Sequence, residues 1–266
     1  MNKKELVSVI MNCYNGERYL KKSIQSLVSQ SYKNWELIFW DNCSSDRSKK
    51  ILCSFSDQRI KYYKNNNHTS LYKARNDAIK KSSGKYIAFL DTDDWWRNNK
   101  LKKQITFFLN NKNSHIVYSN LHTYFQVNKK LKIYHKDLLP SGFIFNQLSK
   151  NYFMPILTLI IKKKIFKKFK FNPQYSIIGD FDLVMRLSNI YKFYSIQDSL
   201  AFYRIHKFNY STNNYDQYLK EIIIWMKSNK KLVKKNNLYL KRLVIELRIK
   251  IFLQKIIKFK NFIQGL

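Results

Sequence analysis

The chain has 266 residues, 45% of them hydrophobic, so it can bury one large core, and its five glycines and three prolines are too few for long disordered linkers. Its formal net charge is +33 at pH 7, and its three scattered cysteines argue against a disulfide framework or a cysteine-ligated zinc site. The N-terminus lacks the apolar region of a signal peptide, and the longest uncharged apolar stretch, Tyr152–Ile161, is about half a membrane span. We therefore expect a cytoplasmic protein without a transmembrane helix.

The first ninety residues alternate between short strand-like runs and amphipathic segments. Runs at residues 6–11, 35–40, 59–63 and 86–90 predict strands. Helical patterns that begin at Glu17, after the polar cluster 44–46, and at about residue 70 predict the helices between them. Such alternation indicates a mostly parallel sheet with helices on both faces, in which ligands bind at the carboxyl ends of the strands.

Beyond residue 90 the pattern is looser. It predicts helices over 101–109 and 180–190, and strands over 116–119, 156–161 and 200–205. From Tyr215 onward the pattern is mostly helical, with thirteen Lys and Arg against three Asp and Glu. We therefore expect an α/β domain over residues 1–214, followed by basic amphipathic helices over 215–266.

The strongest chemical pattern is the run FLDTDD, in which Asp91, Asp93 and Asp94 follow a buried strand. Clustered carboxylates repel one another unless a cation lies among them. Mg²⁺ typically bridges one or two carboxylates to substrate phosphates. The alternative is an acidic helix N-terminus. Because the whole chain has only 17 acidic residues against 50 basic ones, composition alone does not explain the cluster.

Three more polar positions follow or flank the predicted strands. Asp41 can accept hydrogen bonds from a nucleobase or a ribose, or can act as an ordinary turn residue. Tyr14 offers a flat face for base stacking, or is simply an aromatic residue of the core. Arg75 can clamp a phosphate or brace the acidic cluster. Residues two apart do not face each other on a helix, so we expect the partner of Arg75 to be a residue other than Asp77.

Taken in order, these segments resemble a family 2 glycosyltransferase of the GT-A fold. The chain reads VSVIMNCYNG, ELIFWDNCSSD and KARNDAIKKSSGKYIAFLDTDD, where the family typically reads VSVIIPTYNG, ELIIVDDGSTD, an A-R-N segment and G-x-YIAFLDADD. The resemblance covers about residues 7–211. It implies a GT-A domain with a C-terminal helical extension. It also implies transfer of a sugar from a nucleotide diphosphate, with UDP the expected base, to a hydroxyl of a glycan or lipid-linked acceptor in surface polysaccharide or lipopolysaccharide biosynthesis.

The resemblance also implies roles on the donor side. Tyr14 and Asp41 would hold the donor's base, with Arg75 near it. Asp91 and Asp93 would form the D-x-D motif: the first would face the ribose and diphosphate, and the second would reach a divalent Mn²⁺ or Mg²⁺ ion. The chain departs from the family on this side where the family has Pro, Thr, Asp and Gly, which are replaced by Asn12, Cys13, Asn42 and Cys43.

On the acceptor side the resemblance implies that Asp180 is the catalytic base. Gly179 replaces the family's usual Glu, and Asp182 is a second acid two positions on. Because the two acids do not share a helix face, we assign the base to Asp180. His206, in the segment YRIH, would lie near the diphosphate or the metal. One separate base and one metal suffice for an inverting reaction, unlike the two close carboxylates of retaining glycosidases.

Other functions remain open on the sequence. A nucleic-acid-binding protein would explain the charge and the 16% aromatic content, although no RRM, KH or helix-turn-helix signature is present. A nucleotidyltransferase of related fold would usually carry a glycine-rich phosphate loop near the N-terminus, and none is present there. A/T-rich codons would raise the lysine content without selecting any partner. The motifs favour a nucleotide-sugar donor as the partner rather than nucleic acid.

The basic segment 215–266 also carries an apolar stripe. Its members recur at helical spacing: Leu240, Leu243, Val244, Leu247 and Ile251. A basic amphipathic helix is typical of a peripheral anchor on an anionic membrane, which would hold the enzyme at the inner face of the cell membrane near a lipid-linked acceptor. The same stripe would equally pack on the catalytic domain or on a second subunit.

Overall fold

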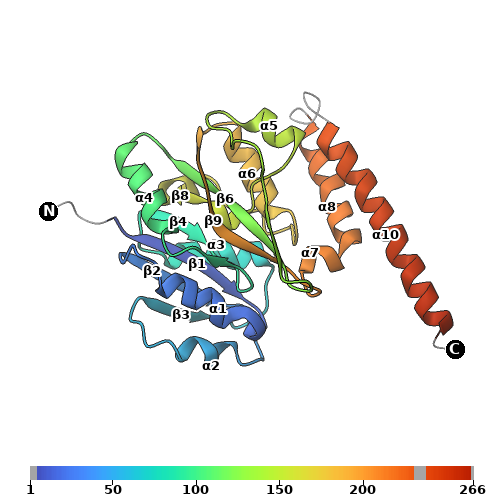
Figure 1. Cartoon of the computed structure of the whole chain (residues 1–266), viewed down its shortest axis with the longest axis horizontal. Coiled ribbons are helices and arrows are strands. Elements are labelled where there is room, and N and C mark those ends of the chain that lie inside the picture. Colours follow the sequence, from blue (N-terminus) through green and yellow to red (C-terminus); the bar gives the residue numbers. More distant parts are fainter. Residues whose placement is uncertain (1–4, 231–237, 265–266) are drawn as a thin grey trace.

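The four strands of the N-terminal half form a parallel sheet. They are β1 (Val7–Cys13), β2 (Trp35–Asp41), β3 (Ile60–Lys64) and β4 (Tyr86–Phe89), and they lie in the order β3-β2-β1-β4. The helices between them are α1 (Glu17–Val28), α2 (Ser48–Cys53) and α3 (Leu71–Lys81). This computed structural model describes residues 5–230 and 238–264 (Figure 1). The predicted alternation of strands and helices is confirmed.

The sheet continues from β4 with mixed strand directions. β8 (Ile160–Lys162) pairs antiparallel with both β4 and β6 (Ile116–Phe125). β9 (Phe193–Ile205) runs parallel to β6, and β5 (Trp95–Trp96) and β7 (Lys130–Ile133) add antiparallel pairs at the margin. The result is a nine-stranded α/β sheet within the described residues.

The remaining helices lie around this second half. They are α4 (Lys100–Asn110), α5 (Phe145–Lys150), α6 (Gly179–Ser188), α7 (Tyr210–Asn213), α8 (Tyr215–Ser228), α10 (Leu238–Gln264) and the 3₁₀ turns η1 (Ile156–Thr158) and η2 (Lys163–Lys167). The strand expected over 156–161 is wrong in its first half. The backbone N–H groups of Thr158 and Leu159 bond back to Pro155 and Ile156, so this apolar run turns locally before it joins the sheet.

Each face of the sheet has its own hydrophobic core. Strand residues alternate in direction, so Ile10 and Phe89 pack on the side of α3 and α6, whereas Val9 and Ala88 pack on the side of α1 and α4. Because both faces are covered, the parallel strands are continuous apolar runs in the sequence rather than alternating ones.

The C-terminal helices pack side by side at the end of the molecule opposite the N-terminus (Figure 1). Ile222 and Trp225 of α8 and Leu240 of α10 belong to the core on the α6 side, and Leu247 is also buried. The predicted apolar stripe therefore packs on the protein at these positions, which is the alternative that the sequence left open. No helix among the described residues has the length and apolar character needed to cross a bilayer. The boundary at residue 214 stays a prediction.

Candidate active site

Polar residues gather at the carboxyl edge of the parallel strands. Parallel strands end on the same side of a sheet, so the segments after β1, β2 and β4 meet there. A cleft of about 670 Å³ opens at this edge. It is lined by the segments after β1, β2, β4 and β9 and by the start of α1, including Tyr14, Tyr19, Asp46, Thr92, Asp93 and His206. The structure thus brings the D-x-D segment and the late histidine, more than a hundred residues apart, to one cavity.

Asp93 and His206 face each other in this cleft. Nε2 of His206 lies 3.0 Å from Oδ2 of Asp93. Nδ1 of the same ring accepts the backbone N–H of Phe208 at 3.1 Å. In the neutral ring Nδ1 is then the acceptor, so Nε2 carries the proton and donates to the carboxylate.

This pair is chemically suited to a divalent cation. Carboxylate oxygen suits Mn²⁺ and Mg²⁺, and imidazole nitrogen suits transition-metal ions. Over residues 5–230 and 238–264 no three His, Cys, Asp or Glu side chains converge as a complete site. A cation here would therefore take its other ligands from donor phosphates and water, as Mg²⁺ commonly does. Ligation through Nε2 of His206 would require that nitrogen to give up its proton and Nδ1 to give up the bond from Phe208.

A buried arginine links the other two acidic residues. The Arg75 side chain is 2% exposed, and its guanidinium forms ion pairs with Asp91 (Nη2 to Oδ1, 2.6 Å) and with Asp180. Asp77 is instead paired with lysines of its own helix. The expectation that Arg75 pairs with a residue other than Asp77 is confirmed. The sequence predicted two roles for Arg75, a phosphate clamp and a brace of the acidic cluster. In the structure it braces two carboxylates.

Asp180 lies at the start of α6 with its side chain 24% exposed, so a small group can reach it. Burial raises the pKa of this carboxyl, and the negative charge of Asp91 raises it further, while Arg75 opposes both. A carboxylate with a raised pKa accepts a proton more readily near neutral pH.

Asp182 has a different environment. Its Oδ1 accepts the indole N–H of Trp225 at 3.0 Å, and its Oδ2 accepts Nε and Nη2 of Arg186 at 3.0 and 2.7 Å. The residue is buried, and both carboxylate oxygens are used within the protein. The geometry therefore favours Asp180 over Asp182 as the acid that is available to a substrate.

Gly179 stands where the family usually has Glu, and the structure shows a steric reason for the small residue. A Cβ atom at this position would lie 2.5 Å from the ring of Tyr72. That ring is buried, and its hydroxyl donates to the carbonyl oxygen of Ile177 at 2.7 Å. Tyr72 thus fills the space next to Asp180 that a longer side chain at position 179 would need.

The residues expected to hold the base differ in exposure. Tyr14 is 55% exposed at the rim of the cleft, with its ring 4.1 Å from the ring of His68. Asp41 is buried, and its two oxygens accept the backbone N–H of Ser44 and the hydroxyl of Tyr62, each at 2.8 Å. Asp41 therefore shapes the loop after β2, while Tyr14 offers an open face.

One departure from the family, in the loop after β2, carries a steric cost. Cys43, which stands where the family has Gly, has a φ of 74°. Only glycine adopts that left-handed region without a steric cost. Asn15, with a φ of 52°, is of the type that tolerates this region best among non-glycine residues.

Arg204, in the segment YRIH, has a structural role that the sequence did not indicate. The Nε of Arg204 donates to the backbone oxygen of Asp93 at 2.8 Å, and its backbone N–H donates to Oδ1 of Asp94 at 2.8 Å. Asp94 is buried, and burial raises its pKa. The third acid of the cluster therefore turns inward and anchors the loop that presents Asp93.

Glu221 is a second residue whose structural role the sequence did not indicate. This α8 residue is 2% exposed, and its carboxylate accepts the backbone N–H groups of Ser176, Ile177 and Ile178 at 2.7, 3.0 and 3.1 Å. It therefore holds the segment directly before Asp180. It is one of only three acidic residues after residue 214, among thirteen Lys and Arg, and this contrast is the signal in the sequence that could have indicated it.

Comparison with known proteins agrees with this architecture. The model of a family described as "Glycosyl transferase family 2" matches residues 8–188. An Escherichia coli protein named "UDP-Glc:alpha-D-GlcNAc-diphosphoundecaprenol beta-1,3-glucosyltransferase WfgD" is 39% identical over 166 residues, which are 62% of this chain and 64% of that protein. An uncharacterized glycosyltransferase of Methanocaldococcus jannaschii is 33% identical over 228 residues, 82% of this chain and 75% of the relative. The chain thus spans slightly less than two thirds of the first of these relatives.

Solved structures with the same fold include two complexes with nucleotide sugars. S. aureus TarS 1-349 in complex with UDP-GlcNAc has a TM-score of 0.63 at 16% identity, over 92% of this chain and 72% of that one. A mannosyltransferase from Pyrobaculum calidifontis, in complex with GDP-Man and Mn²⁺, has a TM-score of 0.65 at 12% identity, over 94% and 74%. At such identities the likeness concerns the fold alone. The fold is that of the GT-A glycosyltransferases, and the chain belongs to glycosyl transferase family 2.

Proposed function

We propose that the chain transfers a sugar from a UDP-sugar to a hydroxyl of a glycan or lipid-linked acceptor, with inversion, in surface polysaccharide or lipopolysaccharide biosynthesis. The observation that carries this proposal is the ion-paired chain Asp91–Arg75–Asp180, which joins the donor motif to a separate base. Two Escherichia coli relatives are named for UDP-Glc and for a diphosphoundecaprenol acceptor, which supports both the donor and the acceptor class.

In this mechanism Asp180 accepts the proton of the acceptor hydroxyl. The acceptor oxygen forms its bond to the anomeric carbon as the bond from that carbon to the diphosphate breaks, and the nucleotide diphosphate leaves with the electron pair. Arg75 keeps the Asp180 carboxylate oriented and its charge balanced. Because a single base acts from the acceptor side and no carboxylate attacks the sugar, the configuration inverts.

Asp93, with Asp91 and His206, would hold a divalent cation, Mn²⁺ or Mg²⁺. When bound, such a cation supplies Lewis-acid neutralisation of the leaving diphosphate. Arg204 and the buried Asp94 keep the Asp93 loop in place for that purpose. Tyr14 would stack on the base at the rim, and Asp41 would maintain the loop beside it.

We also propose peripheral contact with an anionic membrane at its inner face. The face of α10 that does not pack on the protein exposes a second apolar stripe: Ile245, Ile249, Phe252, Leu253 and Ile256. Exposed Lys241, Arg248 and Lys250 lie on the same helix. An apolar stripe with flanking basic residues is the usual form of an interfacial helix, and it would bring the enzyme to a lipid-linked acceptor.

A nucleotide-sugar panel tests the proposal. Release of nucleotide diphosphate would be measured for UDP-, GDP- and dTDP-sugars with Mn²⁺, with Mg²⁺ and with excess EDTA. We expect turnover for a UDP-sugar that depends on the divalent cation. Turnover that persists unchanged in EDTA, or a preference for another base, would contradict the corresponding part of the proposal.

A further inference from the structure

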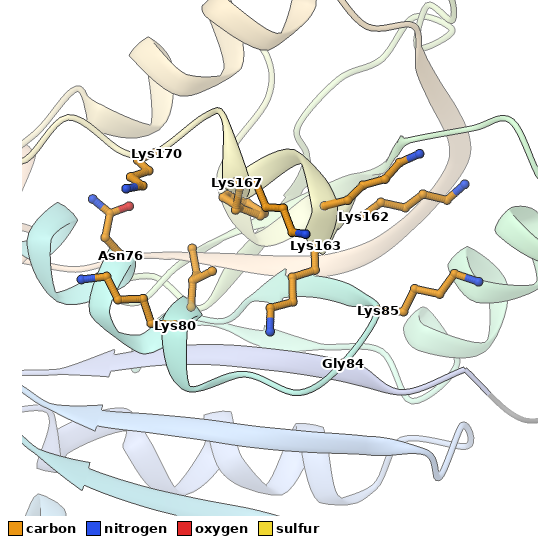
Figure 2. Close-up of a pocket in the computed structure, with 11 residues that line it drawn as sticks. Asn76, Lys80, Gly84, Lys85, Lys162, Lys163, Lys167 and Lys170 are labelled. Atoms are coloured by element: carbon orange, nitrogen blue, oxygen red, sulfur yellow. The ribbon is translucent and has the colours of Figure 1, made fainter.

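A second cavity, of about 510 Å³, lies between the end of α3 and the segment around η2 (Figure 2). Seven of its eleven lining residues are lysines, whereas Lys and Arg together make up about a fifth of the chain. Figure 2 shows Lys80 and Lys85 on one side of it and Lys167 and Lys170 on the other, with the Lys163 side chain extending between the two sides. We call this cavity the lysine pocket. Composition alone does not account for such a concentration.

The lysine pocket is separate from the active-site cleft. The two cavities share no lining residue. Gly84 and Lys85 directly precede β4, whereas Asp91 follows it. At roughly 3.3 Å per residue along a strand, Lys85 and Asp91 are about 20 Å apart. The pocket therefore reaches the amino edge of the sheet, opposite the edge where the proposed donor and acceptor sites lie.

Only two of the seven lysines are neutralised by carboxylates. Lys80 pairs with Asp77 at 2.7 Å, and Lys85 pairs with Glu5 at 2.5 Å. The other five have no carboxylate partner among the residues that the structure describes. The pocket therefore carries an excess of positive charge around a concave surface.

The five remaining ammonium groups are balanced weakly or not at all. Lys162 and Lys163 donate to backbone carbonyl oxygens. Lys164, Lys167 and Lys170 make no side-chain hydrogen bond or ion pair within the described part of the chain. Burial, and then the charge of Lys164, lowers the pKa of Lys162. Mutual repulsion of this kind is relieved when an anion binds.

The lining also indicates which anion fits. The floor is apolar, with the largely buried Ile79 and Phe166, and the volume is within the range of small-ligand sites. All the cations are lysines, which bind phosphate as flexible point charges rather than through a fixed fork geometry. Several point charges around an apolar floor suit a ligand with several phosphate charges and an organic portion. We propose that the lysine pocket binds a soluble organic di- or triphosphate.

A lipid headgroup carries the same phosphate chemistry, but the geometry favours the soluble source. A membrane seated at Lys85 would lie at the edge opposite Asp93 and the cleft. It would hold the cleft away from any acceptor anchored in that membrane. A soluble ligand has no such conflict, and this inference does not depend on which sugar is transferred.

Titration calorimetry with inorganic pyrophosphate tests the proposal. EDTA would be present to exclude metal-dependent binding in the cleft. The pocket variant is Lys164→Gln, Lys167→Gln and Lys170→Gln combined. Its control, Lys50→Gln, Lys130→Gln and Lys136→Gln combined, removes the same charge from exposed positions outside the pocket. We expect the wild type and the control to bind with similar affinity, and the pocket variant to bind at least tenfold more weakly while its thermal unfolding is unchanged.

Three results would overturn the proposal. Equal weakening in both variants would mean that net charge alone attracts the anion. Unchanged pyrophosphate affinity in the pocket variant would place the anion outside the lysine pocket. Loss of sedimentation with phosphatidylglycerol vesicles in the pocket variant, with pyrophosphate binding intact, would assign the pocket to a lipid headgroup instead.

Discussion

The indole Nε1 of Trp225 donates a hydrogen bond of 3.0 Å to Oδ1 of Asp182. This bond joins α8, in the C-terminal segment, to the helix that carries the proposed base. Glu221, one turn earlier on α8, binds three backbone N–H groups directly before that helix. The C-terminal segment therefore helps to hold the helix that carries the proposed base.

We predict that Glu221→Gln lowers the rate of transfer more than it lowers affinity for the donor. A neutral amide cannot accept all three backbone bonds with the same strength, so the segment before Asp180 loosens, and the free energy of unfolding falls by about 1–3 kcal/mol. Steady-state kinetics and donor titration separate the two effects. Gln217→Ala, which removes only a peripheral bond to Glu221, is the control. An equal loss of donor affinity and turnover would contradict a role on the acceptor side.

Asp180→Asn should preserve folding and donor binding, because the amide has nearly the same shape. Transfer should fall by about 10²–10⁴-fold, the usual contribution of a general base. Asp182→Asn should instead weaken the contacts with Trp225 and Arg186, and therefore lower thermal stability more than turnover. The reverse pattern in transfer assays and melting curves would show that the base is Asp182.

The pH dependence of transfer follows from the environment of Asp180. Burial raises its pKa, and the base acts only when it is deprotonated. The rate at saturating substrate should therefore fall, as the pH is lowered, at a higher pH than the ordinary Asp pKa would give. The Asp180→Asn variant should lack this acidic limb in its residual activity. An acidic limb that is unchanged in the variant would assign it to another group.

Asp93→Ala should abolish metal-dependent donor binding, because it removes the carboxylate that faces both the cleft and His206. Calorimetry with UDP in the presence of Mn²⁺ measures this directly. Asp46→Ala, another acidic residue of the cleft, is the matched comparison and should leave the dependence on metal intact. Equal UDP affinity with and without Mn²⁺ in the wild type would remove the basis for a metal at Asp93.

Lys100 should make stability depend on pH. Its side chain is fully buried, with Nζ donating to Gln104, and burial lowers its pKa from 10.5 to about 7. Between those pH values the unfolded chain holds a proton that the folded chain lacks, so the free energy of unfolding rises with pH.

The rise should amount to a few kcal/mol, since each tenfold change in a dissociation constant corresponds to about 1.4 kcal/mol. Lys100→Met should flatten it in urea unfolding series between pH 7 and 10. Lys102→Met, at an exposed neighbouring position, should not. Parallel curves for the wild type and Lys100→Met would contradict the assignment.

Several elements could be predicted from local sequence because their causes are local. Runs such as LVSVIM are apolar almost throughout because both faces of the sheet are covered. Helix α3 is capped at its N-terminus by Ser70, whose side chain accepts the N–H of Lys73. The order of the motifs along the chain was enough to indicate the family and the edge of the sheet where the site lies. These features depend on periodicity, capping and the rule that parallel strands end together.

Other features depended on contacts between distant parts of the chain. The pairing of Arg75 with Asp180 spans 105 positions, the ring of Tyr72 determines what fits at Gly179, and the inward turn of Asp94 depends on Arg204. The sequence by itself determined the α/β alternation, the acidic motif and the family. Only the tertiary structure decided which carboxylates remain available, which face of α10 is exposed and where the lysines gather, because each depends on side chains brought together by packing rather than by sequence spacing.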